Sequence, residues 1–195
     1  MVMKNIYRDA EHPFAQYVRI LGKGKTSSRS LSFDEARDAM GMILRGEVLD
    51  VQLGAFLMLL RVKEESPEEL AGFVAAARDF MQAPQDIPVD LDWSSYAGKR
   101  KHYPWFLFAI KLLVANGVRV FMHGASGHTV NRLYTESLLP VLNMAACHNW
   151  DEVRESMHNS GFAYLSLQRL CPPMGDMIDL RNVMGLRSSV HTLSR

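Results

Sequence analysis

The sequence has few cysteines and no long apolar segment. Cys147 and Cys171 are the only cysteines among 195 residues, so we expect no disulfide scaffold, and a reducing cytoplasm is the simplest compartment. The longest apolar run, Trp105 to Val114, is interrupted by Lys111 and is about half as long as a bilayer requires. We therefore expect no transmembrane helix. Residues 1–8 are not followed by an apolar stretch, which argues against a secretory signal.

The composition excludes several other classes of protein. Hydrophobic residues make up 48% of the chain and charged residues 22%, both near the average of globular domains. This balance excludes collagen-like and low-complexity chains. The length suits one full domain or two small ones.

Charge is segregated along the chain although the net charge is only +1. Residues 1–32 have a net charge of +4, residues 33–90 of −7, residues 91–132 of +5 and residues 133–195 of −1. The two basic stretches would form one electropositive surface if the fold brought them together.

The first part of the chain has the start signals of helices. Ser32 with Glu35, and Ser66 with Glu69, have the spacing of capping boxes, and they predict helices that end near Arg45 and Met81. Residues 51–60 are apolar on nearly all sides, which predicts a helix buried between others. A first helix is expected over residues 13–21.

The pattern changes after Pro84. Short β-rich runs at residues 89–93, 118–122 and 162–167 alternate with helical patterns at residues 104–116, 129–143 and 151–159. This alternation predicts a parallel sheet with crossover helices, and hence an α/β domain joined to an all-α N-terminal domain. Residues 175–184 are again predicted to be helical.

The sequence is similar to two catalytic motifs but completes neither. Gly24-Lys25-Thr26 resembles the end of a phosphate-binding loop, but Arg19 occupies the first glycine position and the preceding segment is helical. Residues 124–127 approach a nucleophile elbow, but His128 stands in place of the last glycine. Nor do the histidines and cysteines have a metal-binding spacing. We therefore predict no catalytic residue and no metal ligand from motifs of these kinds.

A basic loop is more informative. Lys99, Arg100 and Lys101 follow the first predicted strand and precede a helix, the position where open α/β sheets bind ligands. The nearby rings of Tyr96, Tyr103 and Trp105 combine with this charge as in proteins that hold a nucleic-acid backbone and stack its bases. A solvated loop with its aromatic residues anchored in the core is the alternative. The turn that contains Lys23, Lys25 and Arg29 has the same two interpretations.

These segments together resemble one superfamily. The residues that carry the resemblance are 31–36, 42–47, 52–57, 60–63, 68–73, His123-Gly124, 171–174 and 181–188. They are similar to the superfamily of anthranilate phosphoribosyltransferases and class II pyrimidine nucleoside phosphorylases, which is glycosyltransferase family 3.

The resemblance implies a domain organisation and ligands. Residues 1–84 would form a helical dimerisation domain, residues 85–173 the first part of an α/β domain, and residues 174–195 a segment that returns to the helical domain. The family binds phosphoribosyl pyrophosphate with Mg²⁺ between its domains and forms dimers. Its members continue beyond the equivalent of Arg195, so the resemblance implies a chain truncated at its C-terminus.

The family's ligand positions are altered in this sequence. Residues 94–98, including Ser95, Tyr96 and Gly98, replace a glycine-rich GTGGD loop that wraps pyrophosphate, and a bulky Tyr96 stands where bare backbone is needed. Met122-His123-Gly124-Ala125 replaces a Lys-His-Gly-Asn motif. Arg181 matches an arginine that contacts anthranilate. These departures resemble the paralogous YbiB-type branch, which is associated with nucleic-acid binding.

Three functions remain open. In the first, a homodimer on this fold binds DNA or RNA without sequence preference and without a cofactor. Its binding residues are Lys23, Lys25, Arg29, Lys99, Arg100, Lys101 and Tyr103, with Trp105 also available for stacking. In the second, the protein transfers a phosphoribosyl group with Mg²⁺. In the third, the chain is a dimerisation module with no ligand.

Overall fold

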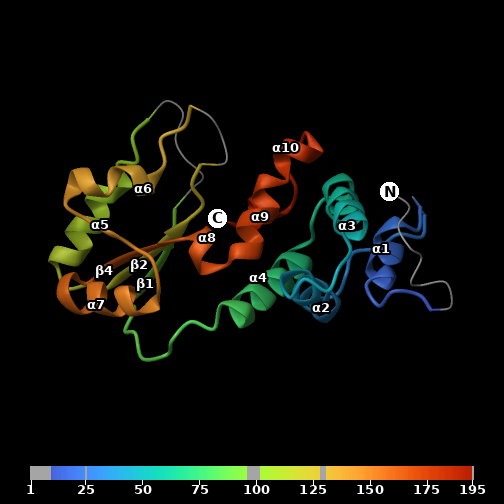
Figure 1. Cartoon of the computed structure of the whole chain (residues 1–195), viewed down its shortest axis with the longest axis horizontal. Helices are drawn as coiled ribbons and strands as arrows, with labels where there is room; N and C mark the ends of the chain where they lie inside the picture. Colours follow the sequence, from blue (N-terminus) through green and yellow to red (C-terminus); the bar gives the residue numbers. More distant parts are fainter. Residues whose placement is uncertain (1–9, 25, 96–101, 128–130, 195) are drawn as a thin grey trace. The chain divides into compact units, whose positions relative to one another are not determined.

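The structure is a computed structural model that describes residues 10–24, 26–95, 102–127 and 131–194. The chain divides into two compact units. The helical unit comprises residues up to Phe80 together with Arg187–Ser189, and the α/β unit comprises Met81–Leu186 and the residues from Val190 onward (Figure 1). In the described part of the chain, no helix has both the length and the apolar character needed to cross a bilayer.

Four helices build the helical unit: α1 (Ala15–Gly22), α2 (Phe33–Leu44), α3 (Asp50–Lys63) and α4 (Pro67–Met81), whose last residue begins the α/β unit. Their core centres on three aromatic side chains with no exposed surface, Phe14, Phe56 and Phe73. Phe56 contacts the other two edge to face, at ring-centroid distances of 5.2 and 6.1 Å. Each buried aromatic ring removes a large apolar area from water, so these three rings contribute strongly to the core of the small unit.

Both predicted capping boxes are confirmed. The backbone N–H of Glu35 donates to Ser32 Oγ at 3.2 Å, and the Ser32 N–H donates to the Glu35 carboxylate at 2.9 Å. Ser66 and Glu69 repeat the pair at the start of α4, at 3.2 and 2.7 Å. Each box satisfies backbone donors that the first helical turn leaves without partners, which fixes where α2 and α4 begin.

Glu69 also connects three segments of the helical unit. Its side chain has no exposed surface, and besides Ser66 it accepts a hydrogen bond from the Leu31 N–H and one from the Lys63 ammonium, each at 2.8 Å. Leu31 precedes α2, and Lys63 is the last residue of α3. A buried carboxylate is tolerated only when charge and hydrogen bonds compensate it, and Glu69 has both.

The helix α3 is less buried than the sequence predicts. Phe56, Leu57 and Leu60 are fully buried, but Val51 is 62% exposed and Val62 is 79% exposed. The apolar residues of α3 therefore lie partly in the core and partly on a face that is exposed to solvent. The prediction that residues 51–60 form a helix buried between others holds for the face of Phe56, Leu57 and Leu60 but not for Val51.

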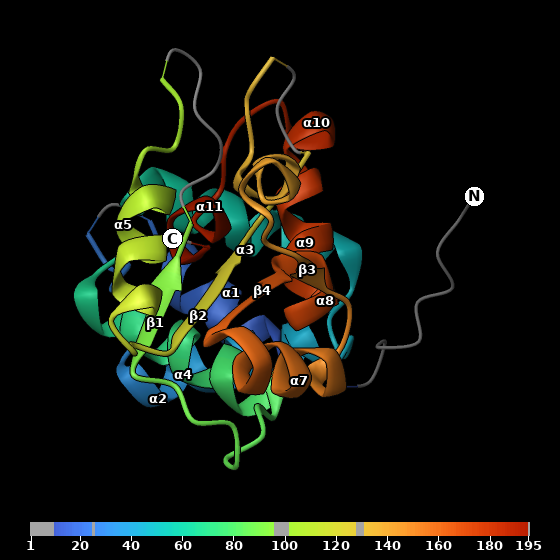
Figure 2. The ribbon, with the colours of Figure 1, turned by 90° about the vertical axis from the view of Figure 1, so that its left-hand side faces the viewer.

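The α/β unit contains a parallel sheet, as predicted, with four strands where the sequence indicated three. The strands β1 (Leu91–Ser94), β2 (Val120–Gly124), β3 (Ala146–Cys147) and β4 (Phe162–Ser166) stand in the order β1-β2-β4-β3. Helix α5 (Phe106–Ala115) covers one face of the sheet and α7 (Trp150–Ser160) covers the other (Figures 1 and 2). Because both faces are covered, β2 and β4 are almost continuously buried.

The two faces of the sheet have separate cores. Met122 and Tyr164 pack with Leu107 and Ile110 of α5, whereas Phe121 packs on the α7 side. This alternation follows from the strand geometry, in which successive side chains point to opposite faces.

The predicted helix over residues 129–143 is wrong in its described part. Only α6 (Thr135–Leu138) and a 3-10 turn η1 (Pro140–Leu142) form there, because Pro140 has no N–H to donate and Asn143 takes a left-handed backbone with φ 53°. The predicted helix at 175–184 divides into α9 (Pro172–Asp179) and α10 (Arg181–Met184), flanked by α8 (Leu167–Leu170) and α11 (Val190–Leu193).

The outer edge of β4 is only partly covered by β3. Ala146 and Cys147 pair with Tyr164 and Leu165, and β3 does not reach Phe162. The Phe162 carbonyl accepts hydrogen bonds from the hydroxyls of Ser156, at 2.7 Å, and Ser160, at 3.1 Å. Two α7 side chains thus satisfy a backbone acceptor that a longer β3 would otherwise pair.

Candidate functional site

The carboxyl ends of the strands bring several predicted site residues together. The parallel register places Ser94 beside His123, and Gly124 beside Ser166. Ser95 follows β1 directly, and its N–H donates to the His123 carbonyl at 2.6 Å. Ser95, His123 and Gly124 therefore form one cluster, at the end of an open sheet where ligands of α/β proteins bind.

Gly124 is required by the close approach of β1. A Cβ at this position would lie 2.0 Å from Ser95 Oγ and 3.0 Å from the Ser95 carbonyl oxygen. Both distances are too short for a side chain, and the Ser95 carbonyl belongs to the backbone. Glycine at 124 thus allows the two strand ends to touch, and this packing role accounts for Gly124 without a ligand.

A polar network lies beside these strand ends. The buried Tyr164 hydroxyl donates to the Gly124 carbonyl at 3.2 Å, and burial raises the pKa of Tyr164 to about 12. Gln168 donates its amide to the Ser126 carbonyl at 3.2 Å, and the Ser126 hydroxyl donates to the carboxylate of Glu136. The phenol remains neutral at physiological pH, so it serves as a hydrogen-bond donor rather than an acid catalyst.

His123 has one engaged and one open ring nitrogen. Its Nε2 lies 3.3 Å from the Asp92 carboxylate, whereas its Nδ1 is buried and makes no hydrogen bond to any residue that the structure describes. Among the same residues, no group of three or more His, Cys, Asp or Glu side chains could hold a metal ion. The cluster at the strand ends therefore offers polar contacts to a ligand.

The predicted basic turn of the helical unit is described in part. Lys23 is exposed and makes no ion pair with a described residue. Arg29 holds the Glu35 carboxylate with two hydrogen bonds, at 2.6 and 2.7 Å, and this pairing lowers the pKa of Glu35 to about 2. Arg29 is therefore already neutralised by a neighbour that also caps α2.

Several predicted residues lie outside the described part of the chain: Lys25, Tyr96, Gly98, Lys99, Arg100 and Lys101. Their assignment to a phosphate-binding surface stays a prediction. Arg181 begins α10, is half-buried and is already engaged in an interaction.

Tyr103 and Trp105 are exposed, and they continue into a larger apolar surface. Tyr103 is 62% exposed and Trp105 64%, which excludes the alternative in which these rings are anchored in the core. Phe108, 55% exposed, and Leu112, 66% exposed, extend the surface along α5. The sequence analysis missed these two residues, although the spacing 105, 108 and 112 is the signal that places them on one helix face.

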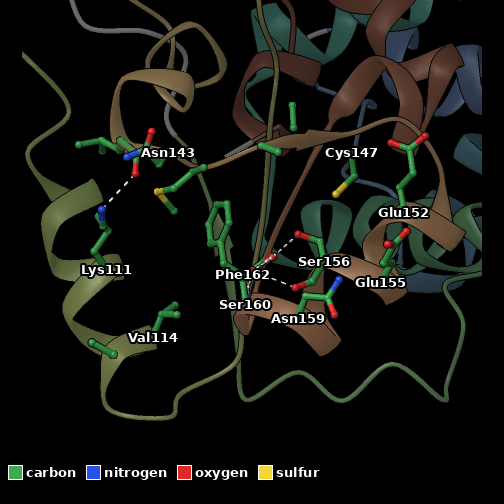
Figure 3. A pocket seen from close by; sticks show the side chains of 15 residues that line it. Lys111, Val114, Asn143, Cys147, Glu152, Glu155, Ser156, Asn159, Ser160 and Phe162 are labelled. Carbon is green, nitrogen blue, oxygen red and sulfur yellow. Dashed lines mark hydrogen bonds between the residues drawn. The ribbon is translucent and has the colours of Figure 1, made fainter.

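A separate pocket of about 600 Å³ lies at the edge of the sheet (Figure 3). Its walls come from the end of α5, residues 142–147, α7 and Phe162 of β4. Lys111 lies at one end, and Glu155 and Cys147 at the other. Burial raises the pKa of the Cys147 thiol, so this cysteine is not an activated nucleophile. None of the predicted binding residues lines the pocket.

The family comparison agrees with the architecture. Residues 15–81 match the helical bundle domain of a glycosyl transferase family. The uncharacterized protein YbiB of Escherichia coli is 28% identical over 185 residues, which cover 93% of this chain and 58% of YbiB. An anthranilate phosphoribosyltransferase of Dictyoglomus thermophilum is 26% identical over 172 residues, which cover 88% of this chain and 50% of the enzyme.

Solved structures give the same fold. The anthranilate phosphoribosyltransferase of Thermus thermophilus superposes with a TM-score of 0.72 at 23% identity, covering 94% of this chain and 54% of that one. The Saccharomyces cerevisiae enzyme in complex with PRPP and Mg superposes with a TM-score of 0.71 at 18% identity, covering 95% and 55%. The predicted resemblance and fold class are confirmed, and the chain spans about half the length of these relatives.

Proposed function

We propose that this chain, whose residues 15–81 match the helical bundle domain of a glycosyl transferase family and whose fold is that of solved anthranilate phosphoribosyltransferases, binds nucleic acid through basic residues. Binding is to phosphates, and it is therefore largely independent of base sequence. The residues proposed to contact the phosphates are Lys23, Lys25, Lys99, Arg100 and Lys101. Arg29 contributes less, because Glu35 already neutralises it.

One observation carries this proposal. The segment from Trp93 to Thr135 contains six Lys or Arg residues and no Asp or Glu. It runs from β1 through α5 and β2 toward α6, so the acid-free sequence includes the carboxyl ends of two neighbouring strands. The excess of cations in this segment attracts phosphates, although Asp92 and Glu136 contact His123 and Ser126 at the strand ends and Asp90 already pairs with Arg119.

The salt dependence of binding tests the proposal. We expect fluorescence anisotropy with a labelled oligonucleotide to show binding that weakens steeply between about 50 and 300 mM salt. Five phosphate contacts predict a slope of log K against log salt of about −3.5 to −4.5 per chain. Absence of binding at the lowest salt would refute the proposal for this chain.

A pair of matched variants tests which cations act. Replacing Lys99, Arg100 and Lys101 by alanine should make the slope shallower by about 2 to 3, because three contacts are lost. The control replaces Arg19, Arg37 and Arg45, which are paired with Glu11, Asp79 and Glu47. It changes the net charge equally and should leave the slope nearly unchanged. Equal effects of the two variants would show that only net charge matters.

Phosphoribosyl transfer is a second candidate, favoured by the polar cluster of Ser95, His123 and Gly124 at the strand ends. Tyr96 counts against this candidate, because it stands in the sequence where the enzymes have glycine. Calorimetric titration with phosphoribosyl pyrophosphate, with and without Mg²⁺, separates the two candidates. Saturable heat would support the enzyme, and its absence alongside oligonucleotide binding would support the first proposal.

The homodimer is a further part of the proposal, with α3 as the contact surface. Val51 and Val62 are exposed on this helix, and their spacing of eleven residues is close to three turns, so both lie on one side. A second copy would cover this apolar face. Sedimentation should show a dimer that becomes a monomer in the variant Val51→Glu with Val62→Glu. A monomeric parent chain at micromolar concentration would contradict the dimer.

A further inference from the structure

The exposed face of α5 carries an ordered row of aromatic rings. Leu107 and Ile110, on the opposite side of the helix, are at most 2% exposed and belong to the core on one face of the sheet. Trp105, Phe108 and Leu112 are more than half exposed and lie at helical positions i, i+3 and i+7. The buried side anchors the helix, so the rings project from a fixed support.

The rings contact one another in a continuous row. Trp105 and Phe108 are stacked, with centroids 6.0 Å apart and planes inclined by 22°. Tyr103 meets Trp105 edge to face at 5.8 Å and 70°. Mutual packing limits the rotation of these side chains, so a flat ligand that binds to them costs little further conformational entropy.

The charge around this row favours an anionic partner. Neither α5 nor the whole segment 93–135 contains an acidic residue, and Lys111 is exposed on the same helix. The Lys111 ammonium donates to the Leu142 carbonyl at 3.0 Å, an uncharged partner that leaves its positive charge unneutralised. An apolar face that carries an exposed cation on the same helix is complementary to a partner that has both flat apolar rings and negative charge.

We propose that Tyr103, Trp105 and Phe108 form a platform on which unpaired bases stack, and that this platform makes the protein prefer single-stranded over duplex nucleic acid. The inference rests on the proposed function, since the phosphates are held by the basic residues. Bases of a duplex already stack on each other, so their faces are not available to the rings, whereas those of a single strand are.

Three probes of equal length test the platform: a labelled 12-mer of thymidine, the same backbone with abasic sites throughout, and a 12-base-pair duplex. We expect the thymidine strand to bind more tightly than the abasic strand by about tenfold for each base that stacks. The abasic strand should keep the salt slope, because it retains the phosphates.

Variants of the row locate the effect. Trp105→Ala and Phe108→Ala should each weaken binding of the thymidine strand by about tenfold and leave the abasic strand unaffected. Trp105→Phe should retain most of the affinity while removing the quenching of Trp105 fluorescence by the bases. The control Phe80→Ala removes an aromatic ring that is 37% exposed in the helical unit, and it should have no effect.

The outcomes separate this inference from the proposed function. Binding of neither single strand refutes the proposed function. Equal affinity for the thymidine and abasic strands, unchanged in Trp105→Ala, overturns the platform and leaves phosphate binding intact. A change of sedimentation mass in Trp105→Ala, without a change in thymidine binding, would show that a second copy covers this face and would likewise overturn the platform.

Discussion

The helical unit and the α/β unit use their charged residues differently. In the helical unit, Arg19, Arg29, Arg37, Arg45 and Lys63 each form an ion pair with a carboxylate of the same unit. In the α/β unit, Arg119 pairs with Asp90 and Arg154 with Asp86 and Asp151, but all three carboxylates lie outside the acid-free segment 93–135.

This difference separates two roles of charge. Where an acid and a base are matched inside one unit, their charges hold segments together and leave little net field for a partner. In segment 93–135, Arg119 is paired with Asp90, whereas Lys111 is exposed and forms no ion pair with a described residue, so its charge is available to an external anion. The helical unit is thus the better place to look for stability, and the segment 93–135 the better place to look for binding.

The largest expected effect is the loss of the buried carboxylate of the helical unit. Glu69→Ala removes the acceptor of three hydrogen bonds from other residues and leaves Lys63 without its partner. We expect the helical unit to lose about 3 to 5 kcal/mol, as when one partner of a buried pair is removed. Urea unfolding followed by far-UV circular dichroism measures this change.

The exposed neighbour Glu68 is the matched control for Glu69. Glu68→Ala should change stability by less than about 0.5 kcal/mol, as is usual for surface positions. If both variants unfolded at the same urea concentration, the ion pair of Glu69 would not be what holds the three segments, and the contrast between the units would weaken.

The next largest effect concerns the strand ends of the α/β unit, where Gly124 packs closely against Ser95. Gly124→Ala should destabilise this unit by about 1 to 3 kcal/mol, because the new methyl group overlaps Ser95. Adding Ser95→Gly should restore part of the loss, since it removes Oγ and Cβ but not the carbonyl oxygen. Thermal unfolding of the single and double variants measures the coupling free energy between positions 95 and 124.

Gly54→Ala is the control for this substitution. A Cβ at Gly54, inside α3, meets no atom within 4 Å, so alanine should stabilise that helix by about 0.5 to 1 kcal/mol. Destabilisation of equal size at both glycines would contradict the requirement for close approach at Gly124.

The smallest expected effect is on the acid sensitivity of the helical unit. Arg29 lowers the pKa of Glu35 in the folded chain to about 2 from an ordinary 4.5. The pair therefore contributes stability above about pH 4.5 and loses it as the pH falls toward 2. The variant Arg29→Ala should be less stable than the parent chain at neutral pH, and its stability should fall less between pH 4.5 and 2. The control Arg61→Ala removes a cation without a described ion pair. Its stability should fall with pH as that of the parent chain does.

The helix starts were predictable because their signals are local. Ser32 and Ser66 each find their partner three residues away, and Pro67 begins α4 at the predicted position. The parallel sheet followed from the alternation of strand and helix patterns. The two-residue strand β3 was missed because it is too short for a periodic signal. The helix predicted over residues 129–143 was wrong in its described part because Pro140 interrupts the helical hydrogen bonds, which the apolar pattern does not show.

The candidate site was harder to predict because its contacts are distant in sequence. The need for glycine at 124 comes from Ser95, which lies on a neighbouring strand. The ion pair of Arg29 with Glu35 is local, but the sequence shows both residues without showing that they face each other. The exposure of Phe108 depends on which side of α5 meets the sheet, and a helix whose only polar residue is Lys111 indicates that side weakly.

The hydroxyls of Ser156 and Ser160 have a consequence for the behaviour of the chain in concentrated solution. An uncovered strand edge offers its backbone groups to the strands of other molecules, which is a common route to aggregation. At Phe162 the carbonyl that such a strand would need is already occupied by these two hydroxyls. Ser156 and Ser160 thus hinder the pairing of this strand edge with another chain at the position that β3 is too short to cover.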